Sequence, residues 1–178
     1  YGLGFEQRII KRLFDLVICI PAILILFGPS LLVALAIFID DRGPVFFLQR
    51  RATLGGKIFN VVKFRTMRTE SSEALPYSGD SDKRVTRVGR VLRKFRIDEI
   101  PQFLNVFTGD MSIVGPRPER LEHVFKYEEA LPEFRYRLQV KAGITGLAQL
   151  IGRYNTTPND KLMLDLVYIH KYSIWQDI

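Results

Sequence analysis

Two adjacent carboxylates, Asp98 and Glu99, are the residues of this 178-residue chain whose types and spacing best suit chemistry. The fixed φ of Pro101 suits the first turn of a helix, so the pair is predicted to lie at or just before a helix N-terminus. The positive end of that helix, with Arg93 and Arg96 nearby, favours the ionised form of both carboxylates. An ionised carboxylate is a nucleophile or a hard-metal ligand, and neighbours on one helical turn point about 100° apart, so the two are expected to take different roles. Without this context, such a pair is usually a solvated surface feature.

A second group of candidate residues is basic. Arg117 lies between Pro116 and Pro118 in the segment 109–118, GDMSIVGPRP, which is predicted to be a loop. Prolines on both sides favour a guanidinium held in a preset direction, which loses little entropy on binding a phosphate; the alternative is a rigid turn with a solvated arginine. Further phosphate-binding candidates are Lys63, Arg65 and Arg153.

Short patterned segments are expected to position these side chains. Two β-branched and aromatic runs predict a β-hairpin with a longer loop, and apolar residues at helical spacing among arginines predict a basic amphipathic helix. The expected elements are strands at 44–49 and 58–64, a surface loop at 69–82, the basic helix at 83–96, a helix beginning at Pro101, a helix at about 119–137 interrupted near Pro132, a glycine-rich turn at 142–146 and a final helix at about 158–172.

The segment 16–39 contains 24 residues without a charge, enough to cross a bilayer as one helix. Gly28 and Pro29 lie near its middle, where a proline kinks or breaks a helix. Basic residues flank both ends, so both ends are predicted to be cytoplasmic. A helix that bends at Gly28–Pro29 and returns to the same face satisfies both flanks, while an ordinary kinked transmembrane helix is the alternative. Near the other end of the chain, Tyr168, Tyr172 and Trp175 are candidates either for the membrane interface or for the core.

Composition and charge narrow the classes of protein. The chain is 47% hydrophobic, so it can form a core, and its single cysteine excludes an intramolecular disulfide. The net charge of +7 arises from the segment 42–96, which has 14 basic and 4 acidic residues. This concentration predicts a polyanionic partner: nucleic acid, anionic lipid or a phosphorylated substrate. There is no Walker A loop or dinucleotide-binding fingerprint, and the two histidines are not at metal-ligand spacing.

Several longer motifs resemble one family over nearly the whole chain from Lys11. The motifs are KRLFDL before the apolar run, KFRTM at 63–67, R-x4-DE-x-PQ-x2-NV at 93–106, GDMSIVGPRP at 109–118 and GITGLAQLIGR at 143–153. They resemble the monotopic phosphoglycosyl transferases, the bacterial sugar transferases that start polysaccharide and glycoconjugate synthesis. The resemblance implies transfer of a sugar 1-phosphate from a nucleoside diphosphate sugar, usually a UDP-sugar, to polyprenyl phosphate.

The same resemblance implies roles for individual residues. Asp98 corresponds to the proposed nucleophile, which forms a covalent phospho-sugar intermediate, and Glu99 to the partner of Mg²⁺. Arg93, Arg117 and Arg153 correspond to the family's arginines, and we add Lys63 and Arg65 as substrate-binding candidates. Gly28–Pro29 corresponds to a Ser-Pro pair at which the family's membrane helix breaks to form a re-entrant hairpin.

The implied fold class is α+β, mostly α. Residues 1–41 are expected to form a lead and a re-entrant membrane hairpin, and residues 42–178 a cytoplasmic catalytic domain with a small β-hairpin and several helices, some at the membrane interface. The implied location is the cytoplasmic face of a bacterial inner membrane. Membrane lipids and both substrates are the expected partners, nucleic acid is not, and a homo-oligomer is left open. The alternatives are a metal-dependent lipid phosphodiesterase and a non-enzymatic, membrane-anchored basic binding module.

Overall fold

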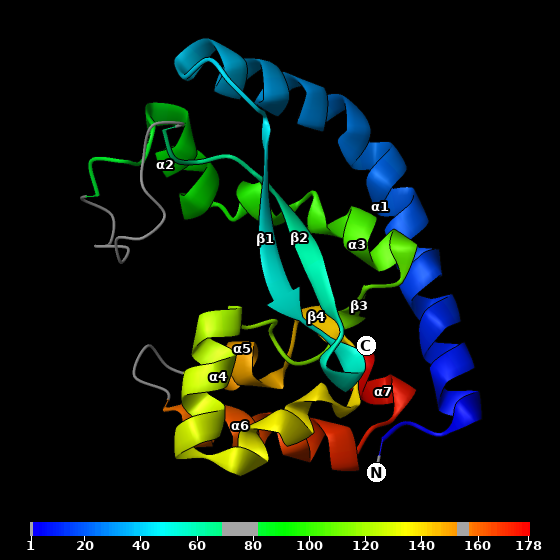
Figure 1. Ribbon diagram of the computed structural model, residues 1–178. Coiled ribbons are helices and arrows are strands. Elements are labelled where there is room, and N and C mark those ends of the chain that lie inside the picture. Colours follow the sequence, from blue (N-terminus) through cyan, green and yellow to red (C-terminus); the bar gives the residue numbers. More distant parts are fainter. Residues whose placement is uncertain (1, 69–81, 153–156) are drawn as a thin grey trace.

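The computed structural model describes residues 2–68, 82–152 and 157–178. A long helix lies along one side of a smaller body made of two short sheets and several helices (Figure 1). In chain order the elements are α1 (Phe5–Asp40), β1 (Phe46–Ala52), η1 (Leu54–Gly56), β2 (Ile58–Phe64), α2 (Arg87–Lys94), η2 (Ile97–Glu99), α3 (Gln102–Thr108), β3 (Met111–Val114), α4 (Leu121–Ala130), η3 (Pro132–Gln139), β4 (Ala142–Thr145), α5 (Leu147–Ile151), α6 (Pro158–His170) and α7 (Ile174–Asp177), where η marks a 3₁₀ helix. The fold is mostly helical with little strand, as the sequence predicts. All but Asp82 of the loop predicted at 69–82 lies outside the described residues.

The helix α1 contains the apolar segment and has 36 residues, which corresponds to about 54 Å. Most of its apolar side chains are exposed, and it is the one helix within the described residues that is long and apolar enough to cross a membrane. Four of its residues are buried: Lys11, Asp15, Cys19 and Ile37. They lie where α1 packs against the rest of the chain, so the exposed remainder is available to lipid.

The helix α1 continues through Pro21 and Pro29 and curves in its second half (Figure 1). A proline removes one backbone hydrogen bond and bends a helix, so this curvature has a local cause that does not end the helix. The break predicted at Gly28–Pro29 is not confirmed, because the structure has one helix from Phe5 to Asp40 instead of two separate arms.

The predicted β-hairpin is confirmed. Strands β1 and β2 are antiparallel, with Phe46 opposite Phe64 and Ala52 opposite Ile58. Burial alternates along β1, which is the pattern of a strand with one covered face. The connection uses Gly55 at φ 67° and Gly56 at φ 78°, conformations that glycine adopts without strain. The hairpin places β2 beside α3 (Figure 1), and β2 also contacts η2.

A second sheet, of β3 and β4, corrects two predictions. The segments 109–118 and 142–146 were expected to be a loop and a turn, but Met111–Val114 and Ala142–Thr145 form parallel strands. The glycines in these segments permit close packing of backbone on backbone. A Cβ added to Gly143 would lie 2.1 Å from the backbone nitrogen of Gly115, a distance that no side chain tolerates. The sheet therefore fixes the start of the GPRP sequence.

The helices confirm some expected boundaries and correct others. Pro101 is the N-cap of α3, close to its predicted place. The predicted helix at 83–96 is shorter: α2 begins after Thr86, whose side chain accepts a hydrogen bond from the Gly89 amide at 2.9 Å. Phe95, the last apolar residue of the predicted segment 83–96, is exposed. The interruption expected near Pro132 is present, since α4 ends at Ala130 and η3 follows.

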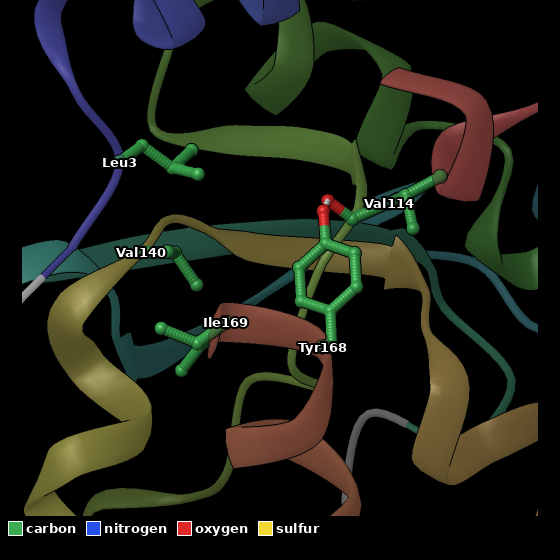
Figure 2. Packing of buried hydrophobic residues seen from close by; sticks show 5 residues of the cluster. All are labelled: Leu3, Val114, Val140, Tyr168 and Ile169. Atoms are coloured by element: carbon green, nitrogen blue, oxygen red, sulfur yellow. Dashed lines mark hydrogen bonds between the residues drawn. The ribbon is translucent and has the colours of Figure 1, made fainter. Parts of the chain in front are cut away.

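The core consists of separate clusters of apolar residues. Figure 2 shows one of them, in which Leu3, Val114, Val140, Tyr168 and Ile169 come together from distant parts of the chain. Tyr168 is a core residue, and its hydroxyl donates to Asp177 Oδ1 at 2.8 Å and lies 3.3 Å from the Val114 carbonyl oxygen.

The other two clusters lie along α1. One contains Cys19 with residues of β2, α3 and β3, and the other contains Ile37 with residues of β2 and α2. Trp175 in α7 belongs to none of the three clusters and is 80% exposed.

Candidate active site

The centre of the candidate site is the Glu99 carboxylate, which two cations share. Lys63 Nζ and Arg117 Nη2 each donate to Glu99 Oε1 at 2.8 Å. The side chains of Lys63 and Glu99 are 18% and 13% exposed, and that of Arg117 is 39% exposed. Three residues that the sequence singled out separately therefore meet, at the junction of β2, η2 and the loop after β3.

Local packing explains why the acidic pair faces this junction. Ile97 and Ile100, on either side of Asp98 and Glu99, pack against the apolar cluster that contains Ile37 of α1. The turn η2 begins after Arg96, which has φ 55°. The pair therefore lies in a short 3₁₀ turn just before α3, as the sequence predicts, with its flanking isoleucines anchored in the core.

The two carboxyl groups have different electrostatic surroundings. Burial by itself would raise the pKa of Glu99, but the charges and hydrogen bonds of Lys63 and Arg117 lower this pKa to about 2. Glu99 is thus ionised at neutral pH, as predicted.

Asp98 departs from the prediction that both carboxylates are shifted toward ionisation. Burial raises the pKa of Asp98 above its ordinary value, and the neighbouring Glu99 charge raises it further, while Lys63 and Arg93 act in the opposite direction. The helix-end argument failed here because a short segment of sequence does not reveal how far a side chain is removed from water.

Arg93 reaches the site from the last turn of α2. Its Nε donates to Thr66 Oγ1 at 2.7 Å, and its charge acts on Asp98. Gly89, one turn earlier, allows α2 to approach the strand end, since an added Cβ would lie 2.2 Å from the Thr66 carbonyl oxygen. The glycine thus lets α2 pack closely enough for Arg93 to approach Asp98.

Two arginines that the sequence analysis did not identify hold the loop that carries Arg117. Arg137 Nη2 donates to the Arg117 carbonyl at 3.0 Å, and Arg51 Nη1 donates to the Pro118 carbonyl at 2.9 Å. Arg137 also pairs with Asp165 at 2.7 Å, with both side chains almost fully buried. The preset direction of Arg117 thus depends on long-range contacts as well as on its prolines, and no local sequence signal indicates them.

The remaining predicted site residues are placed as follows. Arg65 is buried and forms an ion pair with Asp41 at 3.0 Å, which connects the end of β2 to the residue after α1. Arg153 lies outside the described residues. Gly28 and Pro29 are exposed residues of α1, and a Cβ added to Gly28 would have no atom within 4 Å.

The site has ligand chemistry that suits Mg²⁺. Mg²⁺ prefers oxygen ligands and is usually held by one or two carboxylates together with substrate phosphates. Glu99 is ionised, Asp98 is adjacent to it, and the cations around them suit phosphate oxygens. No group of three or more metal-ligating side chains exists within the described residues, so an all-protein cage is not formed there. The residues therefore fit a metal ion that is shared with a substrate.

Comparison of the sequence with known proteins places this chain in a family. A family model described as bacterial sugar transferase matches residues 6–178. The chain is 42% identical over 174 residues to a UDP-N-acetylgalactosamine-undecaprenyl-phosphate N-acetylgalactosaminephosphotransferase of Aeromonas hydrophila, covering 95% of this chain and 41% of the relative. It is 43% identical over 175 residues to a UDP-glucose:undecaprenyl-phosphate glucose-1-phosphate transferase of Caulobacter vibrioides, covering 94% and 65%. The chain thus spans less than two thirds of the length of either relative. With the family model matched over almost all of its residues, this chain belongs to the bacterial sugar transferases.

Proposed function

We propose that this chain transfers a sugar 1-phosphate from a nucleoside diphosphate sugar, with a UDP-sugar as the expected donor, to polyprenyl phosphate. The observation that carries the proposal is the shared Glu99 carboxylate, with Lys63 and Arg117 at 2.8 Å, directly beside Asp98. The names of the two relatives, one acting with UDP-N-acetylgalactosamine and one with UDP-glucose, both on undecaprenyl phosphate, support the substrate classes.

The proposed reaction has two displacements, and Asp98 is the nucleophile. A carboxylate oxygen of Asp98 bonds to the β-phosphorus of the donor while the bond from phosphorus to the bridging oxygen breaks. The bridging oxygen keeps the electron pair and leaves with the nucleoside monophosphate. A phosphate oxygen of the polyprenyl phosphate then bonds to the same phosphorus, and Asp98 leaves as a carboxylate.

The surrounding residues would stabilise the negative charge that develops on the phosphate oxygens in these steps. Arg117 and Lys63 are positioned to bind phosphate oxygens and to hold the Glu99 carboxylate in place. Arg93 helps to keep Asp98 ionised against the effect of burial. A Mg²⁺ ion bound by Glu99 and the diphosphate would neutralise negative charge on the phosphates.

The packing of α1 supports a helix that enters the membrane without crossing it. Near its N-terminal end, Lys11 pairs with Asp177 at 2.6 Å. At its C-terminal end, Asp40 Oδ2 accepts a hydrogen bond from the Val88 amide at 2.9 Å. Both ends are therefore fastened to the same body, whereas a crossing helix would place about 30 Å of hydrocarbon between them. We propose that the exposed middle of α1 dips into the cytoplasmic leaflet of the inner membrane.

The surface of α2 supports the same orientation. Val91 and Phe95 are exposed beside the exposed cations Arg90 and Lys94. Apolar and basic side chains on one short helix suit the boundary between lipid headgroups and acyl chains. With α2 at this boundary, Arg93 and the acidic pair would lie within reach of a phosphate on a membrane-bound acceptor.

The test is to incubate the detergent-solubilised chain with a panel of UDP-sugars and to follow the covalent adduct by intact mass, then UMP release with undecaprenyl phosphate. The wild type should gain the mass of one sugar phosphate, and Asp98→Asn should gain none and lose turnover. Asp110→Asn is the matched control, because Asp110 pairs with Lys57 away from the site, and it should retain the adduct. Wild-type turnover by Asp98→Asn would overturn the covalent route, and hydrolysis of phospholipid without UMP release would favour a phosphodiesterase.

A further inference from the structure

A second cluster of cations lines a cavity at the other end of α1. The cavity has a volume of about 200 Å³, well above the ~10–15 Å³ that one water needs, and is bounded by the first part of α1, by η1 and by residues 139–141. Its charged lining consists of Arg8, Lys11, Arg12, Asp15 and Lys141. None of these residues belongs to the site around Glu99.

Most of these charges already have partners within the protein. Lys11 pairs with Asp177 at 2.6 Å, and the Asp15 carboxylate accepts hydrogen bonds from Ser112 Oγ at 2.8 Å and from the Ile113 amide at 2.9 Å. The only acidic group of the lining is therefore engaged by hydrogen-bond donors of β3.

Of the three cations that remain, Arg12 and Lys141 lie close together. A Cβ placed on Gly109 would lie 3.5 Å from Lys141 Nζ and 3.6 Å from Arg12 Cζ, so the two groups are close to each other beside Gly109, at the edge of the residues that line the cavity. Arg12 donates to two carbonyls at the end of α3, those of Val106 and Phe107. These acceptors are neutral carbonyl groups, so Arg12 has no ion-pair partner among the contacts of the described residues.

The Lys141 ammonium has no hydrogen-bond or ion-pair partner in the part of the chain that the structure describes. It is half-buried: burial and the Arg12 charge lower the pKa of Lys141, while the charges of Asp15 and Asp110 act in the opposite direction. Three cations of the lining, Arg8, Arg12 and Lys141, stand against one lining carboxylate, Asp15, so the cavity has an excess of positive charge that a bound anion would balance.

We propose that this cavity binds a phosphate group, which Lys141 and Arg12 contact and which Arg8 at the rim assists. A guanidinium and an ammonium that lie close together are the donors that proteins use for phosphate. The exposed apolar residues Phe5 and Ile9 lie beside Arg8 on α1, so the headgroup of an anionic phospholipid is a source of this phosphate. Free phosphate has the same chemistry and is distinguished by experiment.

The test uses the detergent-solubilised full chain and native mass spectrometry. The probes are dioleoylphosphatidylglycerol, dioleoylphosphatidylcholine and inorganic phosphate. The wild type should bind phosphatidylglycerol more tightly than phosphatidylcholine, and Lys141→Gln should weaken phosphatidylglycerol binding about tenfold, as expected for loss of one charge-assisted contact. Lys126→Gln, which removes an exposed charge from α4, is the matched control and should bind as the wild type does.

The outcomes separate the two sources of phosphate. One outcome is that the wild type shows no preference between the two lipids, that inorganic phosphate competes with them, and that Lys141→Gln abolishes this competition. This outcome would assign the cavity to free phosphate. Equal binding of all three probes by the wild type and by Lys141→Gln would overturn the proposal. Arg8→Gln should reproduce the loss, which guards against a folding defect in the first variant. Adduct formation at Asp98 is measured in the same samples, so failure of this proposal is distinguishable from failure of the proposed function.

Discussion

Lys63 and Glu99 form an ion pair of 2.8 Å in which both side chains are largely removed from solvent. The pair connects the end of the hairpin to the acidic turn, and Arg117 shares the same carboxylate oxygen. One carboxylate thus orients two phosphate-binding candidates at once.

Replacing Glu99 tests this arrangement directly. Glu99→Gln leaves Lys63 and Arg117 without their shared counter-charge and removes a ligand for Mg²⁺, so turnover should fall at least tenfold, equivalent to about 1.4 kcal/mol, and more Mg²⁺ should be needed. UMP release is measured across a Mg²⁺ titration. Glu129→Gln, an exposed glutamate of α4, should leave the titration unchanged. An unaltered Mg²⁺ dependence in Glu99→Gln would remove Glu99 from the metal site.

The fall in the rate of adduct formation at acid pH, the acid limb of its pH profile, should follow the ionisation of Asp98. The pKa of Glu99 is about 2, so Glu99 stays ionised as pH falls, whereas the pKa of Asp98 is raised above its ordinary value. Adduct formation requires the ionised form and should therefore be lost as pH falls through the pKa of Asp98. The rate of adduct formation against pH is the measurement.

Two variants should shift the acid limb of the pH profile of adduct formation in opposite directions. The Glu99 charge raises the pKa of Asp98 and the Lys63 charge lowers it. Glu99→Gln should therefore move the limb to lower pH, and Lys63→Met should move it to higher pH. Shifts of the same sign in both variants would show that another group sets the limb.

Breaking the buried pair of Arg137 and Asp165 should destabilise the fold. Arg137→Met leaves Asp165 as an uncompensated buried charge, for which a loss of about 3–5 kcal/mol in the free energy of unfolding is expected. Arg137→Met combined with Asp165→Leu should recover much of that loss, as measured by chemical denaturation.

The double variant also tests whether Arg137 positions Arg117. It lacks the hydrogen bond to the Arg117 carbonyl, so the rate of adduct formation should stay low although stability returns. Recovery of both properties together would assign Arg137 a purely structural role.

Alanine at two glycines should have different effects on stability. A Cβ at Gly143 would lie 2.1 Å from the backbone nitrogen of Gly115, so Gly143→Ala should cost about 1–3 kcal/mol or more and disturb the GPRP loop. Gly28 has open space and a helical environment, so Gly28→Ala should be neutral or stabilising by about 0.5–1 kcal/mol. Thermal unfolding of both variants is the measurement, and equal effects would contradict the close approach of the strands.

The attachment of α1 predicts that its two ends lie on one side of the membrane. Glu6→Cys and Arg42→Cys, each in a Cys19→Ser background, place single thiols at exposed positions beside the two ends. In intact cells neither should react with a membrane-impermeant maleimide, and both should react after the inner membrane is permeabilised. Labelling of only one of them in intact cells would show that the helix crosses.

Local pattern was sufficient for much of the fold. The β-hairpin, the helix after Pro101 and the interruption near Pro132 follow from alternation, glycine and proline within a few residues. The sheet of β3 and β4 could not be found in this way. Its strands have four residues each, and Met111 pairs with Ala142, far along the chain, so no short window contains the pairing.

In the candidate site, too, some features could be predicted from local sequence and others could not. Asp98, Glu99 and Arg117 could be chosen by residue type and by neighbouring prolines. Their electrostatics and supports could not, because the burial that raises the pKa of Asp98 and the hydrogen bond from Arg137 both depend on tertiary packing.

The apolar cluster that joins Ile37 of α1, Phe64 of β2 and Leu92 of α2 has a consequence for how an acceptor is met. Because the isoleucines around the acidic pair pack on that same cluster, the proposed nucleophile is held at a fixed position relative to α1. If α1 enters the membrane as proposed, Asp98 then has a fixed height above the lipid surface. A polyprenyl phosphate in the membrane would then reach Asp98 by diffusion in two dimensions. A water-soluble analogue of this acceptor would have to reach Asp98 by diffusion in three dimensions.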